Sequence, residues 1–168
     1  PIRHENGSNF DAKQTLRWLT DVCSVERDYI MHNAMYDLGW LWAEGIEVKG
    51  RVVDTMIVAA LLDENRFSYA LNALGRDYLN ERKSEKDLRE AAASFGVNAK
   101  SEMWKLPAHF VGAYAEQDAA LTLKLWQHFK GMILKDDIAD IFDLELKVLK
   151  VVFAMRKKGV RVDLEKAE

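Results

Sequence analysis

Apolar residues recur along the chain at two different spacings, and the spacing predicts which segments are helices and which are strands. Steps of three and four positions predict helices at residues 11–22, 34–44, 55–62, 68–79, 83–93, 107–129 and 136–158. Short apolar runs predict strands at residues 28–31, 51–53 and 160–162. Strands that alternate with helices indicate an α/β fold, although the second half of the chain is unusually helical.

Capping residues support several of these boundaries. Asp11 is a suitable N-cap for the first helix, and Pro107 is tolerated in the first turn of the long helix at 107–129. The helix at 136–158 ends in Arg-Lys-Lys-Gly. Its basic residues lie at the negative end of the helix dipole, and Gly159 is the expected C-cap.

The composition of the chain changes at residues 131–137, between the two long helices. This change is the best candidate for a domain boundary. We therefore expect one domain over residues 1–134 and the beginning of a second over residues 135–168.

Asp118 interrupts the apolar face of the helix at 107–129. That face carries Val111, Tyr114, Leu121 and Leu125 at steps of three and four. A carboxylate buried there without a partner would cost several kcal/mol or would take up a proton. A salt bridge or a helix cap received from elsewhere in the fold would satisfy it, and so would a divalent cation. Asp118 is therefore a candidate metal ligand, with Tyr114 one turn away on the same face.

Asp37 lies in the first turn of a predicted helix, just beyond the strand at 28–31. A structural interpretation is available, in which Asn33 is the N-cap and Asp37 favours the positive end of the helix dipole. The position also suits a ligand site, because open α/β sheets bind ligands beyond the carboxyl ends of their strands. Asp54 follows the next strand in the same way, but it directly precedes Thr55, so we interpret it as the N-cap of that helix.

Composition and charge narrow the class of protein. The net charge is −3, which argues mildly against a protein that coats nucleic acid, although metal ions bound at a nuclease site would supply positive charge locally. The single cysteine, Cys23, excludes an internal disulfide and a zinc–cysteine cluster, and it fits a reducing cytoplasm. No apolar run reaches the ~18–20 residues that a membrane helix needs.

The other groups with reactive side chains are interpreted as structural or solvated. The four histidines show no zinc-site spacing, although His32 could line the same cleft as Asn33. Cys23 has no base partner arranged beside it in the sequence, so a nucleophilic role is not expected. Two acidic pairs are expected on the solvated surface: Asp143 with Glu145, and Asp163 with Glu165.

Several stretches, taken in order, resemble a known family. Residues 31–41 (MHNAMYDLGWL) resemble the second motif, Asn-x-x-x-aromatic-Asp, of proofreading 3′–5′ exonucleases of the DEDD superfamily. The stretch YAEQDAALTL, which begins at Tyr114, resembles the third motif of the tyrosine branch of that superfamily. Residues 53–56 and 69–79 resemble its connecting segment. Residues 143–163 resemble the stretch that leads into the polymerase domain of bacterial and phage family A DNA polymerases.

This resemblance implies a ribonuclease H-like exonuclease fold, with a mixed sheet flanked by helices, followed by the helical start of a polymerase domain. It implies two divalent metal ions, Mg²⁺ or Mn²⁺, as cofactors. The expected partners are the single-stranded 3′ end of primer–template DNA and the rest of the polymerase chain, with no membrane contact. The expected reaction removes 3′-terminal nucleotides by hydrolysis.

The resemblance also implies a role for individual residues. Asp118 would bind the metal ion that activates the attacking water, and Tyr114 would orient that water. Asp37 would hold the second metal ion, and Asn33 would contact the single-stranded 3′ end. A phosphate contact is expected from Lys49, with Arg51 as its alternative.

The chain departs from the family pattern at its beginning. The first motif, Asp-x-Glu on the first strand, would precede Pro1 and is absent from this sequence. We therefore expect a sheet without its leading strands, and an isolated chain that binds metal poorly and is nearly inactive. One alternative is a ribonuclease D-like RNA 3′ exonuclease. Another is a vestigial exonuclease fold that braces a polymerase without catalysis, although the joint retention of the second and third motifs argues against it.

Overall fold

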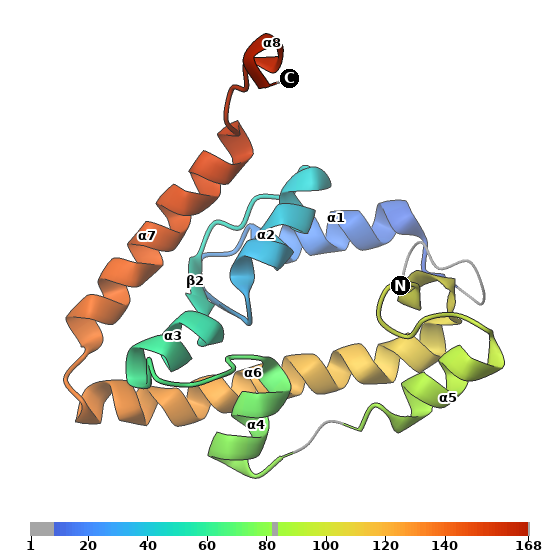
Figure 1. Ribbon diagram of the computed structural model, residues 1–168, viewed down its shortest axis with the longest axis horizontal. Helices are drawn as coiled ribbons and strands as arrows, with labels where there is room; N and C mark the ends of the chain where they lie inside the picture. The colour runs from blue at the N-terminus through green and yellow to red at the C-terminus, as the bar shows by residue number, and fades with distance from the viewer. Residues whose placement is uncertain (1–8, 82–83, 168) are drawn as a thin grey trace.

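The computed structural model describes residues 9–81 and 84–167 (Figure 1). In chain order its elements are α1 (Ala12–Cys23), β1 (Asp28–Met31), α2 (Ala34–Ala43), β2 (Arg51–Asp54), α3 (Thr55–Leu62), α4 (Leu71–Leu79), α5 (Lys86–Ser94), the 3₁₀ turn η1 (Met103–Lys105), α6 (Ala108–Lys135), α7 (Ala139–Lys158) and α8 (Leu164–Ala167).

Strands β1 and β2 pair in parallel, and α2 connects them. A parallel pair cannot be joined by a tight turn, so a helical crossover is the usual connection. The register places Asp28 opposite Arg51 and Met31 opposite Asp54. β2 is buried after its first residue, whereas β1 is only half-buried. The carboxyl ends of the two strands therefore meet where α2 and α3 begin.

Helix α6 is the longest helix of the described residues and runs horizontally across the lower half of Figure 1. Its 28 residues give a length of about 42 Å. β1, α3, α4, α5 and α7 all contact it. Its second half contributes Leu125 and Phe129 to the main core, where they pack with Val53, Val58 and Leu74. Burial of each large apolar side chain stabilises the fold by ~1.5–3 kcal/mol, so α6 holds the strands and the flanking helices in place.

Several expected features are present. β1 and α3 have the expected bounds, and the Asp11 carboxylate caps α1 by accepting a hydrogen bond from the Gln14 N–H at 2.7 Å. Gly159 ends α7 with a φ of 71°, and its N–H donates to the Met155 carbonyl. The architecture is mostly helical with a small parallel sheet, which is consistent with the predicted α/β class.

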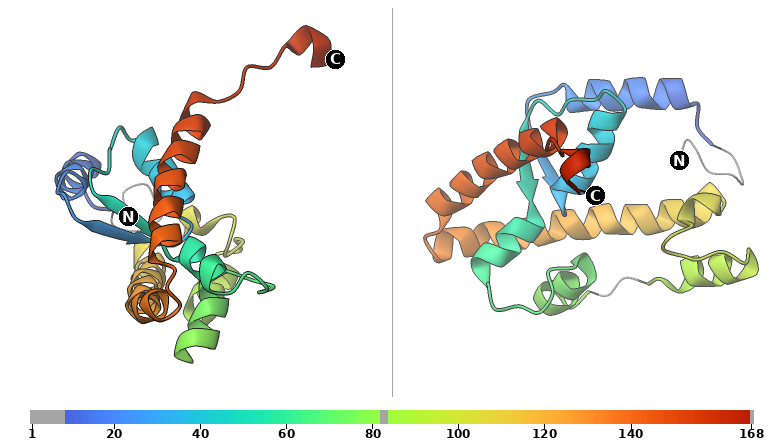
Figure 2. Two further views of the ribbon diagram at one scale, coloured as in Figure 1. Left: turned by 90° about the vertical axis from the view of Figure 1, so that its left-hand side faces the viewer. Right: turned by 45° about the horizontal axis from the view of Figure 1, so that its top comes forward.

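The strand expected at residues 160–162 was wrong. These residues form an exposed, irregular connection between α7 and α8. A short alternating run forms a strand when a neighbouring edge accepts its hydrogen bonds, and α8 stands away from the rest of the molecule (Figure 2).

Several helix boundaries also differ from expectation, and α7 begins at Ala139 rather than at residue 136. α6 continues past residue 129 to Lys135, because Ile133 extends its buried face. α4 begins at Leu71 rather than at residue 68. The expected start of the next helix, residue 83, lies outside the described residues, and α5 is described from Lys86.

The chain turns between α6 and α7 at residues 136–138, with Asp137 at a φ of 53°. The composition change at residues 131–137 therefore begins inside a continuous helix. The division into a domain at 1–134 and another at 135–168 remains a prediction.

Helix α7 has two apolar faces. One is buried against the body of the molecule and carries Phe142, Leu146 and Leu149. The other follows steps of three and four along the outside and is exposed: Ile141, Leu144, Val148, Val151 and Met155. Neither α7 nor any other helix within residues 9–81 and 84–167 is long and apolar enough to cross a membrane.

Gly50→Ala should destabilise the fold, because a Cβ at this position would overlap the backbone carbonyl of Arg27 and crowd the Tyr29 ring. We expect the free energy of unfolding to fall by roughly 2–3 kcal/mol. Gly112→Ala is the matched control, because nothing lies within 4 Å of a Cβ there, and alanine in a helix interior stabilises by ~0.5–1 kcal/mol over glycine. Urea denaturation of both variants measures the difference, and similar effects of the two would contradict the close approach at Gly50.

Candidate active site

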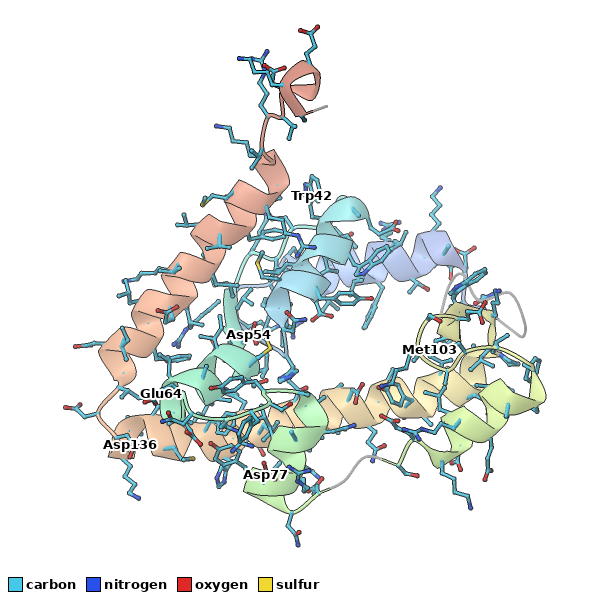
Figure 3. All side chains as sticks on the ribbon, in the orientation of Figure 1. Trp42, Asp54, Glu64, Asp77, Met103 and Asp136 are labelled. Carbon is cyan, nitrogen blue, oxygen red and sulfur yellow. The ribbon has the colours of Figure 1, made fainter. Side chains whose placement is uncertain are left out.

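A cleft of about 840 Å³ lies between α1, α2 and β1 on one side and α6 on the other. Asn33 and Asp37 line it from the beginning of α2, and Tyr114 and Asp118 line it from α6. The structure thus brings together four of the five residues expected at the site. Met103, which is labelled in Figure 3, lines the same cleft from η1.

Asp54 holds the start of α2, which contributes residues to this cleft. Its side chain is 1% exposed, at the end of β2 (labelled in Figure 3). One carboxylate oxygen accepts from the N–H of Met56, so Asp54 caps α3 as expected, and the same oxygen accepts from the N–H of Asn33, both at 2.9 Å. The other oxygen accepts from the Ala34 N–H at 2.7 Å. A single buried carboxylate therefore stabilises the first turns of both α2 and α3.

Asn33 precedes α2, but its side chain does not cap the helix. Its backbone is left-handed, with φ 61° and ψ 55°, and no side-chain capping bond is made. The interpretation of Asn33 as a side-chain N-cap was therefore wrong, because Asp54 performs that task from the neighbouring strand. Asparagine tolerates the left-handed region better than most residues. Its amide is consequently available to line the cleft.

Asp37 has a raised pKa. Partial burial is the main cause, a hydrogen bond from its own backbone opposes it, and the negative charge of Asp54 adds to it. Both raising effects disfavour the ionised form. A cation in the cleft would compensate the charge, so the position of Asp37 suits a ligand better than a purely structural carboxylate.

Asp118 lies where the apolar face of α6 leaves the core and enters the cleft. Leu121 and Leu125 on that face are buried, whereas Asp118 and Tyr114 are half-buried. The Oδ1 atom of Asp118 is itself buried. Its backbone carbonyl accepts a hydrogen bond from the Thr122 hydroxyl at 2.8 Å. Because Oδ1 is buried, its attraction to a cation bound in the cleft would be less screened by water than that of an exposed carboxylate.

Lys49 does not line this cleft. It lines a separate hollow, which lies between α7 and the loop that follows α2. Arg51, its alternative, also points elsewhere: its guanidinium donates to the Asp143 carboxylate at 2.8 Å and lies over the Phe142 ring. Asp143 is exposed, as expected for the solvated surface.

His32 and Cys23 line the cleft, as do the catalytic candidates. The Nδ1 atom of His32 lies 2.9 Å from the Thr55 hydroxyl, which in turn donates to the Met31 carbonyl. Burial raises the pKa of the Cys23 thiol against the opposing charge of Arg27. A protonated thiol is a poor nucleophile and a poor metal ligand.

Two aromatic residues of the site were not expected to line it, although Tyr36 is the aromatic residue of the second motif. Tyr36 and Trp40 line the cleft from α2, with their rings edge to face at 6.3 Å. They are 60% and 59% exposed. Because α2 is apolar on nearly every face, its aromatic residues are typical of a core helix. Besides the motif position of Tyr36, the available signal was the spacing of four residues between Tyr36 and Trp40, which places both on one face of α2.

The donor atoms in the cleft suit a hard divalent cation. Asp37 and Asp118 offer carboxylate oxygens, and Mg²⁺ commonly binds through one or two carboxylates, water and substrate phosphates. Within residues 9–81 and 84–167 no group of three or more His, Cys, Asp or Glu side chains is arranged to hold a metal. The residues present therefore fit a site that substrate and further ligands would complete.

The comparison with protein families agrees with this geometry. A model of the 3′–5′ exonuclease domain of family A DNA polymerases matches residues 6–134. All four residues brought together in the cleft lie inside the matched range. The chain belongs to the 3′–5′ exonuclease domain family of family A DNA polymerases. Proteins of this family generally use divalent metal ions.

Relatives with this domain carry polymerase names. The chain is 36% identical over its whole length to the DNA-directed DNA polymerase of Pseudomonas phage M6. It is 31% identical, over 94% of its length, to the DNA polymerase DpoZ of Salmonella phage PMBT28. It is 26% identical, over 91% of its length, to the DNA polymerase I of Rhizobium leguminosarum. The chain spans 26%, 27% and 14% of these relatives, respectively.

Asp54→Ala should be among the most damaging single changes near the site. It would leave the N–H groups of Asn33, Ala34 and Met56 without their acceptor, and we expect a loss of about 3 kcal/mol in the free energy of unfolding. Asp11→Ala is the matched control, because it removes one exposed cap and should cost about 1 kcal/mol. Both are measured by urea denaturation. A cost at Asp54 no larger than at Asp11 would contradict the shared-cap geometry.

Asp37→Asn should raise the thermal midpoint of the metal-free protein at neutral pH. Because the folded state raises the pKa of Asp37, ionisation of this group destabilises the fold at pH values above that pKa. The advantage of the variant should shrink as the pH falls and Asp37 becomes protonated in the wild type. Thermal melts from neutral to acidic pH test this. If the variant were less stable than the wild type at neutral pH, the raised pKa of Asp37 would be contradicted.

Proposed function

We propose that this chain is the 3′–5′ exonuclease portion of a DNA polymerase that removes 3′-terminal nucleotides from single-stranded DNA during proofreading. One observation carries the proposal. Asn33 and Asp37, which follow a strand, line one cleft with Asp118, which interrupts an apolar helix face, and with Tyr114 one turn away on that face.

Two divalent metal ions, Mg²⁺ or Mn²⁺, would supply Lewis acidity for activation of water and for stabilisation of the leaving 3′ oxygen. Asp118 would hold one ion and Asp37 the other. The Tyr114 hydroxyl would orient the attacking water, and the Asn33 amide would position the terminal nucleotide. Lys49 is left out of the catalytic contacts, because it lines the hollow beside α7.

A catalytic role explains the chain better than a purely structural one. Burial and the negative charge of Asp54 raise the pKa of Asp37, so the fold disfavours its ionised form. A brace for a polymerase gains nothing from such a group, whereas a metal site requires it. A ribonuclease D-like activity would use the same four residues. The names of the relatives, all of them DNA polymerases, favour DNA as the substrate.

The exposed stripe of α7 supports a place within a longer polypeptide. Its five apolar residues repeat at steps of three and four, which is the pattern of a helix packed on two sides. We propose that this outer face packs against the rest of a polymerase. In the predicted division at residue 135, α7 belongs to the beginning of the polymerase domain. Such an enzyme would act in the cytoplasm of a bacterial or phage-infected cell.

Asp118→Ala should lower the rate of 3′ trimming by about 100-fold or more, as expected for the loss of a group that stabilises the transition state. The assay follows Mn²⁺-dependent shortening of a 3′-labelled single strand by a longer polymerase that contains these residues. Asp143→Ala is the control and should leave the rate unchanged, because Asp143 is exposed and pairs with Arg51 outside the cleft.

The same assay separates the alternatives. We expect the 168-residue chain to be nearly inactive by itself, so robust cleavage that depends on Asp118 would disprove the need for further carboxylates. Faster trimming of an RNA strand of the same sequence would favour the ribonuclease D-like activity. A longer polymerase with no trimming at all would support the non-catalytic brace.

A further inference from the structure

A second hollow, of about 400 Å³, adjoins the catalytic cleft on the outer side of α2. Tyr36 and Trp40 line both, so the two spaces share a wall made of aromatic side chains. The hollow continues between α2 and α7, where Trp42 and Phe153 form its apolar floor. Figure 3 labels Trp42 on the part of α2 that faces the upper end of α7.

The aromatic rings of this hollow are available to a ligand. Tyr36, Trp40 and Trp42 are 60%, 59% and 50% exposed, although aromatic residues usually bury most of their surface. They follow one another along α2 and lead away from the cleft. Bases of single-stranded DNA stack on such rings without regard to sequence.

Cations border the same rings. The Lys157 ammonium lies 5.8 Å from the Trp42 ring centre and 5.6 Å from that of Phe153. Arg156, the residue before it, is anchored by a hydrogen bond of 3.2 Å to the Met35 carbonyl. Lys150 of α7 and Lys49 of the loop after α2 line the next hollow, which shares Trp42, Phe153 and Lys157 with this one. Glu26 and Glu47 also line that next hollow, whereas no acidic residue lines the hollow that holds Arg156 and Lys157. The positive charge that suits phosphates is therefore concentrated at Arg156 and Lys157.

We propose that the surface formed by Tyr36, Trp40, Trp42, Phe153, Arg156 and Lys157, here called the α2–α7 track, binds the single-stranded DNA segment that leads into the cleft. The proposal rests on the exonuclease function and extends it from the terminal nucleotide to the nucleotides upstream. Trp40 and Trp42 stack on bases, and Arg156 and Lys157 contact phosphates. Lys49 acquires a phosphate contact in this scheme at the far end of the track, outside the catalytic cleft.

Single-stranded DNA fits this surface better than a protein partner does. The hollow shares Tyr36 and Trp40 with the cleft that would hold the 3′ end. Its exposed rings on α2 face cations on α7, and single-strand grooves combine these two kinds of group. A protein partner would be expected to favour an apolar face free of charge, such as the outer stripe of α7. Because the strand must pass over Tyr36 and Trp40, the track also keeps its 3′ end directed toward Asp37.

Gly39 allows a direct test, because it lines the track and nothing lies within 4 Å of a Cβ at this position. Gly39→Glu adds a negative charge, and Gly39→Ala is the matched neutral variant. Fluorescence anisotropy of labelled oligothymidylates of ~4 and ~12 nucleotides, without metal ions, measures binding to the 168-residue chain. We expect Gly39→Glu and Trp42→Ala to weaken binding of the longer strand about tenfold and to leave the shorter one nearly unchanged.

Gly39→Ala and Lys147→Gln should bind both strands as the wild type does, since Lys147 is exposed on α7 and lies outside the track. Unchanged binding of the longer strand by Gly39→Glu and Trp42→Ala would overturn the proposal. The proposal would also be overturned if these two variants lost self-association but kept DNA binding, because the surface would then bind a second copy of the chain. Metal-free binding does not depend on hydrolysis. If Gly39→Glu and Trp42→Ala weaken binding of the longer strand as expected, but no Asp118-dependent cleavage is found, only the proposed enzyme activity is refuted.

Discussion

Three hydrogen bonds from backbone N–H groups to one buried carboxylate decide where this site can form. Asp54 ends β2, caps the helix that follows it and holds the residues that begin α2. The crossover between two parallel strands is thereby closed at the end where the candidate ligands lie. Because Asn33 receives this support through its N–H, its backbone is left-handed and its side chain lines the cleft.

The second half of the site depends on α6, which is both a core element and a wall of the cleft. Its buried residues Leu125 and Phe129 position the helix against β2 and α3. The same face then emerges into the cleft at Asp118. A single rigid helix thus aligns Tyr114 and Asp118 at a fixed spacing, and the packing that orients them is distant from the chemistry. The pKa of Asp37 is raised mainly by partial burial and further by the charge of Asp54, and a cation in the cleft would offset both effects.

Local sequence rules were sufficient where the cause of a structure is local. The cap at Asp11, the bounds of β1 and α3 and the end of α7 at Gly159 each depend on neighbouring residues. Asp118 was also identifiable, because a carboxylate in an apolar stripe conflicts with the pattern around it. The hydrogen bond from the Ala34 N–H to Asp54 could not be identified in this way, since it joins residues twenty positions apart through the sheet register. For the same reason, neither the place of Lys49 beside α7 nor the exposed rings of α2 followed from their own segments.

The central claim is that the start of α2 and the middle of α6 form one cation site. The most direct measurement is the broadening of backbone amide NMR signals by Mn²⁺, which detects weak binding as well as strong. The claim predicts that signals near Asp37 and near Asp118 broaden together at the same Mn²⁺ concentration, and that Asp118→Asn weakens both effects. Broadening confined to other acidic residues, such as those around Asp136 and Asp140, or left unchanged by Asp118→Asn, would contradict it.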